Sequence, residues 1–359
     1  MNHMFEDETM FNNVFLENDD FKEMAKKIYD SNKGCQILGV SGAGKTTMAN
    51  ELIDIIEKNG KKCIKLAPTR KAASHIKGKT LHKFYLELYL SNNYEKKILK
   101  SLNHVDYMIV DEISMVKEVF YRFLVLLKRY QPKLKFIIVG DFDQLKPVND
   151  VYRGEYINSP ALYNLCEGMR INLQKCRRSD SQLFKLYDKV RKGENIDISE
   201  FKVKKLNRLN IAYSHKTRIQ VNRICMETFG RDKEYLKSYP LESNPKSQFT
   251  KVYEGLPIVS YQNVNKLEIY NSEVFTVHRI DILENKFFIM KDGNELSFEI
   301  NMFKCMFYPA YCITCHVSQG CTFDEPYTIY DWSHPFMCKS AKYVSLSRST
   351  SIHYIQIQN

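Results

Sequence analysis

The sequence has no long hydrophobic run, because no stretch of about 18 consecutive apolar residues occurs in it. It therefore has no segment suited to crossing a bilayer, and we expect no membrane partner. The acidic start, MNHMFEDETMFNN, also lacks the basic segment followed by an apolar one that marks a secretory signal. These absences favour an intracellular protein.

Repeats, low-complexity tracts and long linkers are absent as well. The ten cysteines are scattered over 359 residues, a length sufficient for two or three domains with cores of their own, so disulfides are not needed. The content of 44% hydrophobic and 26% charged residues is typical of globular proteins. The net charge of +11 is compatible with a polyanionic partner.

Glycine is scarce, with 14 residues in all, yet three of them lie in the stretch GVSGAGKTT at residues 39–47. This stretch fits the pattern GxxxxGK[ST] and continues an apolar run over residues 35–40. A strand that ends in such a turn and opens a helix directs backbone N–H groups at phosphate oxygens. The pattern predicts ATP or GTP binding, with Lys45 on the β- and γ-phosphates and Thr46 on Mg²⁺. The predicted loop consists of Gly39, Ser41, Gly42, Ala43, Gly44, Lys45, Thr46 and Thr47.

Apolar strands alternate with helical patterns in the first half of the chain. We expect helices at 19–31, capped by Asp19 or Asp20, and at 46–58, and strands at 63–67, 106–110 and 136–139. Alternating strands and helices predict an α/β fold with a parallel, doubly wound sheet. The first domain is predicted to span residues 1–165.

The second half repeats this alternation around a β-rich segment. We expect a strand at 209–213 followed by a helix, and strands at 326–330 and 352–357. Between them, Asp292-Gly293 predicts a hairpin turn in a stretch rich in β-branched and aromatic residues. The predicted domains are a second α/β domain in two parts, 166–250 and 301–359, and a small all-β insertion at 251–300.

Two further patterns carry polar residues to the ends of strands. The strand in MIVDEISMV ends in Asp111 and Glu112, where one carboxylate can hold Mg²⁺ through water and the other can orient or deprotonate the attacking water. FIIVGDFDQLKPV, residues 136–148, places Gln144 beyond the next strand, where an amide can contact the γ-phosphate and the attacking water.

The order and spacing of GxxxxGKT, DEIS and GDxxQLxPV resemble superfamily 1B helicases of the RecD, Dda and Pif1 type. The resemblance implies two RecA-like P-loop domains with parallel sheets, the second with a Src-homology-3-like insertion. LAPTRKAA (66–73) and KTLHKF (79–84) resemble DNA-contacting motifs, and YCITCHVSQGCTFD (311–324) resembles the motif that couples DNA to ATP. The implied DNA contacts are Thr69, Arg70, Thr80, His82, Thr314 and His316.

Two arginines complete the catalytic set that the resemblance implies. LQKCRRSD (173–180) looks like the motif whose arginine enters the ATP site from the second domain, here Arg178, and YVSLSRSTS (343–351) looks like the one that supplies Arg348. The implied catalytic residues are therefore Lys45, Asp111, Glu112, Gln144, Arg178 and Arg348. The first helix lacks the glutamine with which many relatives read adenine.

This resemblance implies an ATP- and Mg²⁺-dependent DNA helicase that moves 5′ to 3′ on single-stranded DNA and unwinds duplex or forked DNA. We expect a monomer that acts in replication, recombination or repair. A superfamily 1B RNA helicase and a translocase that does not separate strands are the alternatives, the latter because residues 85–106 contain no identifiable strand-separating pin. A P-loop kinase or GTPase is disfavoured, since neither explains the two late arginine motifs.

Cys312, Cys315 and His316 also read CxxCH, a haem-attachment pattern, and with Cys321 they suggest zinc. Haem attachment requires export, and zinc requires four ligands at a plausible spacing, which these residues do not provide. His316 fits the helicase motif directly, so we interpret the cysteines as small core residues.

Overall fold

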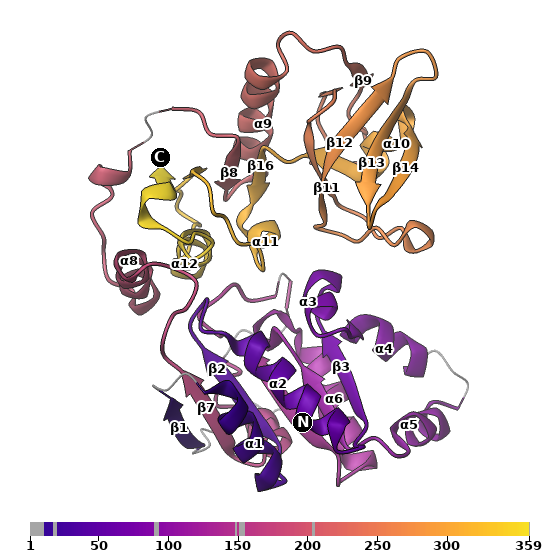
Figure 1. Ribbon diagram of the computed structural model, residues 1–359, viewed down its shortest axis with the longest axis vertical. Coiled ribbons are helices and arrows are strands. Elements are labelled where there is room, and N and C mark those ends of the chain that lie inside the picture. The colour runs from indigo at the N-terminus through magenta and orange to yellow at the C-terminus, as the bar shows by residue number, and fades with distance from the viewer. Residues whose placement is uncertain are drawn as a thin grey trace. The chain divides into compact units, whose positions relative to one another are not determined.

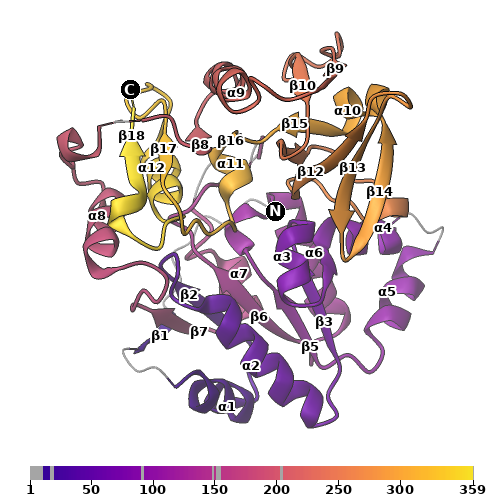
Figure 2. The same ribbon diagram turned by 45° about the horizontal axis from the view of Figure 1, so that its top comes forward.

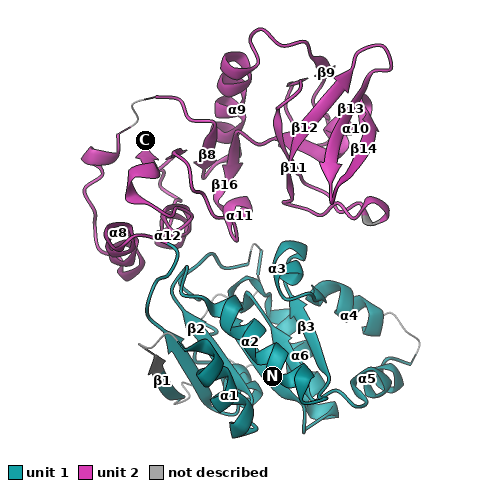
Figure 3. Cartoon of the chain, viewed as in Figure 1, with its two compact units in different colours: residues 1–178 teal, residues 179–359 magenta. Residues whose placement is uncertain are grey.

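The computed structural model describes residues 11–16, 20–89, 93–147, 149–150, 155–202 and 205–358. The acidic start at residues 1–10, Asp19 and Val148 lie outside these ranges. The chain forms two compact units, residues 1–178 and 179–359 (Figure 3). Among the described residues, no helix combines the length and apolar character that crossing a bilayer requires.

Unit 1 is built on a seven-stranded sheet in the order β1-β7-β2-β6-β5-β3-β4. Every neighbouring pair in it is parallel, as the alternation of strands and helices predicted. Parallel strands place their carboxyl ends at one edge of the sheet, so the loops that follow them gather there. The strands are β1 (Asn12–Leu16), β2 (Cys35–Gly39), β3 (Cys63–Ala67), β4 (Lys79–Thr80), β5 (Tyr107–Val110), β6 (Lys135–Gly140) and β7 (Met169–Leu173).

The helices of unit 1 start and end where local capping allows. Asp20 caps α1, because its Oδ1 accepts the N–H of Glu23 at 2.9 Å. Helices α1 and α2 pack against each other beside the sheet (Figure 1). The helices are α1 (Phe21–Ser31), α2 (Lys45–Lys58), α3 (Arg70–His75), α4 (Leu81–Tyr89), α5 (Tyr94–Leu102), α6 (Glu118–Tyr130) and α7 (Pro160–Leu165), with a 3₁₀ turn η2 (Ile113–Met115).

The first unit extends beyond residue 165, where we predicted its end. Strand β7 pairs with both β1 and β2, so residues 169–173 belong to the first sheet. The first unit therefore ends at Arg178.

Unit 2 contains a four-stranded parallel sheet in the order β16-β8-β17-β18. The strand predicted at 352–357 starts only at Ile355, because residues 352–354 form a 3₁₀ turn capped by Ser351. The strands are β8 (Leu209–Ala212), β16 (Cys312–Thr314), β17 (Tyr327–Ile329) and β18 (Ile355–Ile357). The helices are α8 (Ser181–Lys192), α9 (His215–Phe229), α11 (Cys315–Ser318) and α12 (Lys339–Leu346), with 3₁₀ turns η3 (Ser199–Phe201) and η5 (Ile352–Tyr354).

The β-rich part of unit 2 is larger than the predicted segment 251–300. A five-stranded antiparallel sheet has the order β14-β13-β12-β11-β15, and β9 and β10 form a separate two-stranded ribbon. Asp292 and Gly293 have φ of 49° and 82° and turn β13 into β14, as predicted. The elements are β9 (Leu236–Ser238), β10 (Thr250–Val252), β11 (Pro257–Ser260), η4 (Asn265–Leu267), β12 (Val274–Asp281), β13 (Lys286–Lys291), β14 (Asn294–Glu299), α10 (Ile300–Met306) and β15 (Phe307–Pro309).

Candidate functional site

The predicted phosphate loop joins β2 to α2 and depends on two glycines. Gly42 and Gly44 have φ of 78° and 85°, in the left-handed region that glycine adopts without strain. A Cβ on Gly44 would lie 2.7 Å from the ring of Phe21, and one on Gly42 would lie 2.7 Å from the Cβ of Arg178. A larger residue at either position would strain the backbone and collide with its neighbour.

Lys45, the first residue of α2, folds back over this loop. Its Nζ donates to the carbonyl oxygen of Gly39 at 2.9 Å and to that of Val40 at 3.0 Å. The N–H of Ala43 also donates to the carbonyl of Val40, which tightens the turn. Because the positive end of the α2 dipole lies at the same place, the turn concentrates positive charge suited to a polyphosphate.

Thr46 and Asp111 meet beside Lys45. Oγ1 of Thr46 donates to Oδ2 of Asp111 at 3.0 Å, and the N–H of Glu112 donates to Oδ1 at 2.8 Å. The pKa of Asp111 lies above its usual value, because the effect of burial exceeds the lowering by these two hydrogen bonds and by the nearby Lys45. A hydroxyl and a carboxylate supply the oxygen ligands that Mg²⁺ prefers, so this pair fits a magnesium ion bound together with a nucleotide.

Gln144 lies at the same edge of the sheet, because β5 and β6 are parallel neighbours. Its Nε2 donates to Oδ2 of Asp141 at 3.0 Å, and its backbone N–H bonds to the carbonyl oxygen of Asp141. Asp141 thus fixes the direction of the amide. Sequence reasoning named Gln144 but missed Asp141, whose signal is the GD pair that ends β6.

The two consecutive arginines of LQKCRRSD lie against the phosphate loop. The backbone N–H of Arg177 donates to the carbonyl of Gly42 at 2.8 Å, and Nη1 of Arg178 lies 3.5 Å from Oγ of Ser41. The guanidinium of Arg177 also stacks 4.0 Å above the ring centre of Phe21. Arg178 was expected to arrive from the second domain, but it is the last residue of unit 1, because these contacts tie the segment to the loop. Sequence reasoning did not find the pairing of Phe21 with Arg177.

Arg348 belongs to unit 2, where hydrogen bonds order its guanidinium group. Nε donates to the carbonyl of Val344 at 2.9 Å, Nη1 to that of Cys321 at 3.2 Å, and Nη2 to Oγ of Ser347 at 2.9 Å. Arg348 is only 2% exposed, so these bonds within unit 2 must be exchanged before its guanidinium contacts a phosphate.

The four predicted DNA contacts of unit 1 gather at the carboxyl ends of the neighbouring strands β3 and β4. Oγ1 of Thr69 accepts the N–H of Ala72 at 3.1 Å, and Oγ1 of Thr80 accepts the N–H of Lys83 at 3.2 Å. Arg70 begins α3, and His82 is the second residue of α4. The structure therefore brings these residues to one edge of the first sheet.

The two predicted DNA contacts of unit 2 lie at the end of β16. Thr314 is the last residue of that strand, and His316 follows in α11. Partial desolvation lowers the pKa of His316, which favours the neutral imidazole with a single N–H donor.

Cys312 and Cys315, the cysteines of the CxxCH pattern, are packing residues. Both are buried, and Oγ of Ser345 donates to Sγ of Cys315 at 3.2 Å. Burial raises the pKa of the Cys315 thiol to about 11 and that of Cys312 as well, which disfavours the thiolate that zinc requires.

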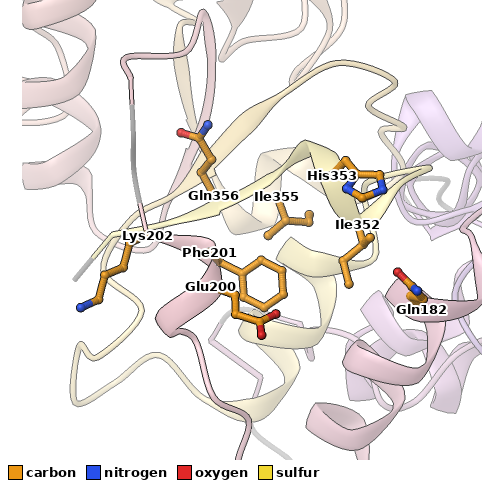
Figure 4. A pocket seen from close by; sticks show the side chains of 8 residues that line it. All are labelled: Gln182, Glu200, Phe201, Lys202, Ile352, His353, Ile355 and Gln356. Atoms are coloured by element: carbon orange, nitrogen blue, oxygen red, sulfur yellow. The ribbon is translucent and has the colours of Figure 1, made fainter.

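A cavity of about 350 Å³ lies in unit 2 between α8, η3, η5 and β18 (Figure 4). Phe201, Ile352 and Ile355 give it an apolar wall, and Gln356 and Glu200 contribute polar groups. None of the predicted site residues lines this cavity.

The glycine turn after β2, the buried carboxylate after β5 and the all-parallel sheet define a P-loop nucleotide-binding domain. The family model of the AAA domain matches residues 22–150, which lie within unit 1.

Comparison with known proteins extends the likeness beyond unit 1. The chain is 36% identical over 125 residues to the ATP-dependent DNA helicase Pif1 of Campylobacter jejuni, covering 31% of this chain and 28% of that protein. It is 27% identical over 304 residues to the RecBCD enzyme subunit RecD of Buchnera aphidicola, covering 77% and 46%. The matches thus span less than half the length of these curated relatives.

A solved structure described as the structural basis for DNA unwinding at forked duplex DNA by two coordinating Pif1 helicases matches with a TM-score of 0.71. The match covers 96% of this chain and 92% of that one at 24% identity, so it establishes a shared fold. The chain is thus similar to helicases of the RecD, Dda and Pif1 type, as its motifs indicated.

Proposed function

We propose that the chain is an ATP-dependent DNA helicase that moves 5′ to 3′ along single-stranded DNA and separates the duplex ahead of it. The observation that carries the proposal is the hydrogen bond between Thr46 and Asp111 beside Lys45, which assembles a site for a nucleotide with Mg²⁺. The names of the curated relatives and the forked DNA of the matching structure support DNA as the second ligand.

Bound ATP supplies the phosphoryl group whose transfer to water releases free energy. Lys45 neutralises charge on the β- and γ-phosphates, and Thr46 and Asp111 would hold Mg²⁺. Glu112 accepts a proton from the attacking water, and Gln144, oriented by Asp141, positions that water.

Arg178 and Arg348 supply the positive charge that stabilises the γ-phosphate during transfer. Arg178 is already close to the loop through Ser41. Arg348 belongs to the other unit, so we propose that its action links hydrolysis to a movement of the units.

Thr69, Arg70, Thr80 and His82 bind the backbone of the DNA strand in this proposal. The hydroxyl oxygens of both threonines accept backbone N–H groups, which leaves each hydroxyl proton to donate outward. Hydroxyl, guanidinium and imidazole donors suit phosphate oxygens and carry no sequence preference. Thr314 and His316 perform the same role in unit 2.

The choice of nucleic acid is tested by ATPase stimulation with matched single-stranded DNA and RNA oligonucleotides. We expect strong stimulation by DNA. Equal or greater stimulation by RNA would instead favour a superfamily 1B RNA helicase.

Polarity and strand separation are tested with forked substrates that carry a 5′ tail, a 3′ tail or no tail. We expect ATP-dependent unwinding only from the 5′ tail. Unwinding only from 3′ tails would refute the polarity, and intact DNA-stimulated hydrolysis without unwinding of any fork would indicate a translocase that does not separate strands.

A further inference from the structure

The ribbon of β9 and β10 in unit 2 has one anchored face and one exposed face. Leu236 and Val252 point inward and join the hydrophobic core of the β region. Figure 2 shows the two strands side by side at the top of the view. Ser238 and Thr250 are buried on the same inward side, and because side chains alternate along a strand, Lys237 and Lys251 lie on the opposite, outer face.

The exposed face carries aromatic and basic side chains in alternation. Tyr235, Lys237 and Tyr239 occupy every second position along β9 and its flanks. Phe249 and Lys251 do the same along the neighbouring strand β10 and its flank. Tyr239 is 61% exposed, Phe249 41% and Tyr235 36%. The rings of Tyr239 and Phe249 lie 5.6 Å apart, and Nζ of Lys251 lies 5.1 Å from the ring centre of Tyr235.

Two like charges stand directly opposite each other in the middle of this face. The register pairs Lys237 with Lys251, an arrangement that destabilises an antiparallel ribbon unless an anion lies between them. Among the described residues, no carboxylate forms an ion pair with either lysine. The segments 235–239 and 249–252 contain no acidic residue of their own.

We propose that this face, defined by Tyr235, Lys237, Tyr239, Phe249 and Lys251, is an additional binding surface for single-stranded nucleic acid. The inference rests on the proposed function, and it adds a surface that none of the sequence motifs marks. Exposed rings stack on unpaired bases, whereas ammonium groups bind the phosphates between them. Neighbouring side chains on one strand face are about 7 Å apart, so the ribbon offers rings and charges in a fixed alternation. An acidic protein segment would use the lysines but would gain nothing from the paired rings.

The test is binding of a fluorescein-labelled oligothymidylate to the full chain, measured by anisotropy at several salt concentrations. The double variant Tyr239→Ala/Phe249→Ala is expected to bind about 5- to 150-fold more weakly, the loss of one stacked base. Lys237→Gln/Lys251→Gln is expected to reduce the slope of log K against log salt by about 1.4, or about 0.7 for each phosphate contact.

Matched controls separate the surface from general effects. Phe336→Ala removes another ring, 74% exposed, and Lys266→Gln/Lys339→Gln removes the same charge elsewhere in unit 2. Both should bind like the wild type, and Tyr239→Phe/Phe249→Tyr should retain affinity because the rings remain. Basal ATP hydrolysis should be unchanged in every variant.

A direct readout of stacking comes from Tyr239→Trp. The chain has one tryptophan, the buried Trp332, so the introduced indole would be the exposed fluorophore, and stacking on a base should quench it. Wild-type binding with no change in the ribbon variants would overturn this inference and leave the proposed function standing. Loss of affinity in the lysine variant alone, with competition by polyglutamate and no quenching, would assign the face to an acidic protein. Absence of any nucleic-acid binding by the wild type would overturn both proposals.

Discussion

Each unit contains a parallel sheet in which a strand leads directly into a long helix, but the two turns differ. In unit 1, α2 begins after Gly44, which has no side chain, and Lys45 lies over the turn. In unit 2, α9 begins after Ser214, whose Oγ accepts the N–H of Thr217 at 3.1 Å. A carboxylate oxygen of Asp331 also accepts the N–H of Ser214 at 2.8 Å.

The difference shows how two similar strand-to-helix turns can have different roles, one stabilising a helix and the other leaving its N-terminus available to a ligand. At α9 the chain's own hydroxyl and carboxylate satisfy the first turn and supply the negative charge that a helix N-terminus favours. At α2 the cap residue Gly44 has no side chain to accept hydrogen bonds or carry negative charge, so a phosphate can supply both. We therefore propose that the nucleotide binds at the turn of unit 1.

The largest effect is expected from Lys45→Ala, which should abolish ATP hydrolysis, because the turn loses its ammonium group. Steady-state hydrolysis with and without single-stranded DNA measures it. Lys216→Ala, near the start of α9, is the matched control and should keep the basal rate. Wild-type hydrolysis by Lys45→Ala would refute the role of the α2 turn.

Arg348→Ala tests whether unit 2 contributes to the rate of ATP hydrolysis without contributing to nucleotide binding. We expect hydrolysis to fall by about 10³- to 10⁵-fold, the range for an arginine that stabilises phosphoryl transfer. Binding of a fluorescent ATP analogue should remain close to that of the wild type, as it should in the exposed control Arg223→Ala. Lost nucleotide binding in Arg348→Ala would contradict a role confined to turnover.

Glu112→Gln should slow hydrolysis by about 10²- to 10⁴-fold, since the amide cannot accept the proton of the attacking water. Nucleotide affinity should persist, because the Thr46–Asp111 pair is untouched. Glu57→Gln, which disrupts the surface ion pair with Lys65, provides the comparison. Equal rates for Glu112→Gln and the wild type would assign the proton to another group.

Gly44→Ala and Gly60→Ala separate crowding from backbone strain. Both glycines have positive φ, of 85° and 71°, but only the first has a ring within 3 Å of the added Cβ. We expect Gly44→Ala to destabilise the protein by about 1–3 kcal/mol more than Gly60→Ala and to weaken nucleotide binding. Thermal unfolding measures the change in stability, and nucleotide titration measures the change in affinity. Equal losses of stability and affinity in both variants would show that crowding by Phe21 is not important.

The smallest effect is expected at the capped turn. Ser214→Ala should lower the free energy of unfolding by about 1 kcal/mol, the usual value of a helix cap. The corresponding drop in Tm is about 2–4 °C by thermal unfolding. Nucleotide affinity should stay the same, and any large loss of it would show that the α9 turn also takes part in binding.

Local signals predicted much of this fold. The glycine turn, the start of α1 at Asp20 and the hairpin at Asp292-Gly293 follow from backbone preferences of neighbouring residues. Helix α9 follows strand β8, as predicted; Ser214 caps it, and its buried residues repeat with helical spacing.

What sequence reasoning missed depends on contacts between distant residues. Strand β7 has the sequence MRINL, and the charged Arg170 interrupts the apolar pattern that would predict a buried strand. In the structure Nε of Arg170 donates to Oε1 of Gln36 at 2.7 Å, and the guanidinium lies 3.7 Å from the ring centre of Phe11. The stacking of the Arg177 guanidinium on the Phe21 ring likewise depends on tertiary packing, so no local sequence pattern predicts it.

Titration of the full chain with a non-hydrolysable ATP analogue and Mg²⁺ tests the central claim most directly. The account predicts one nucleotide per chain, bound with wild-type affinity by Ser214→Ala and not bound by Lys45→Ala. Two nucleotides per chain, or a single site unaffected by Lys45→Ala, would contradict it.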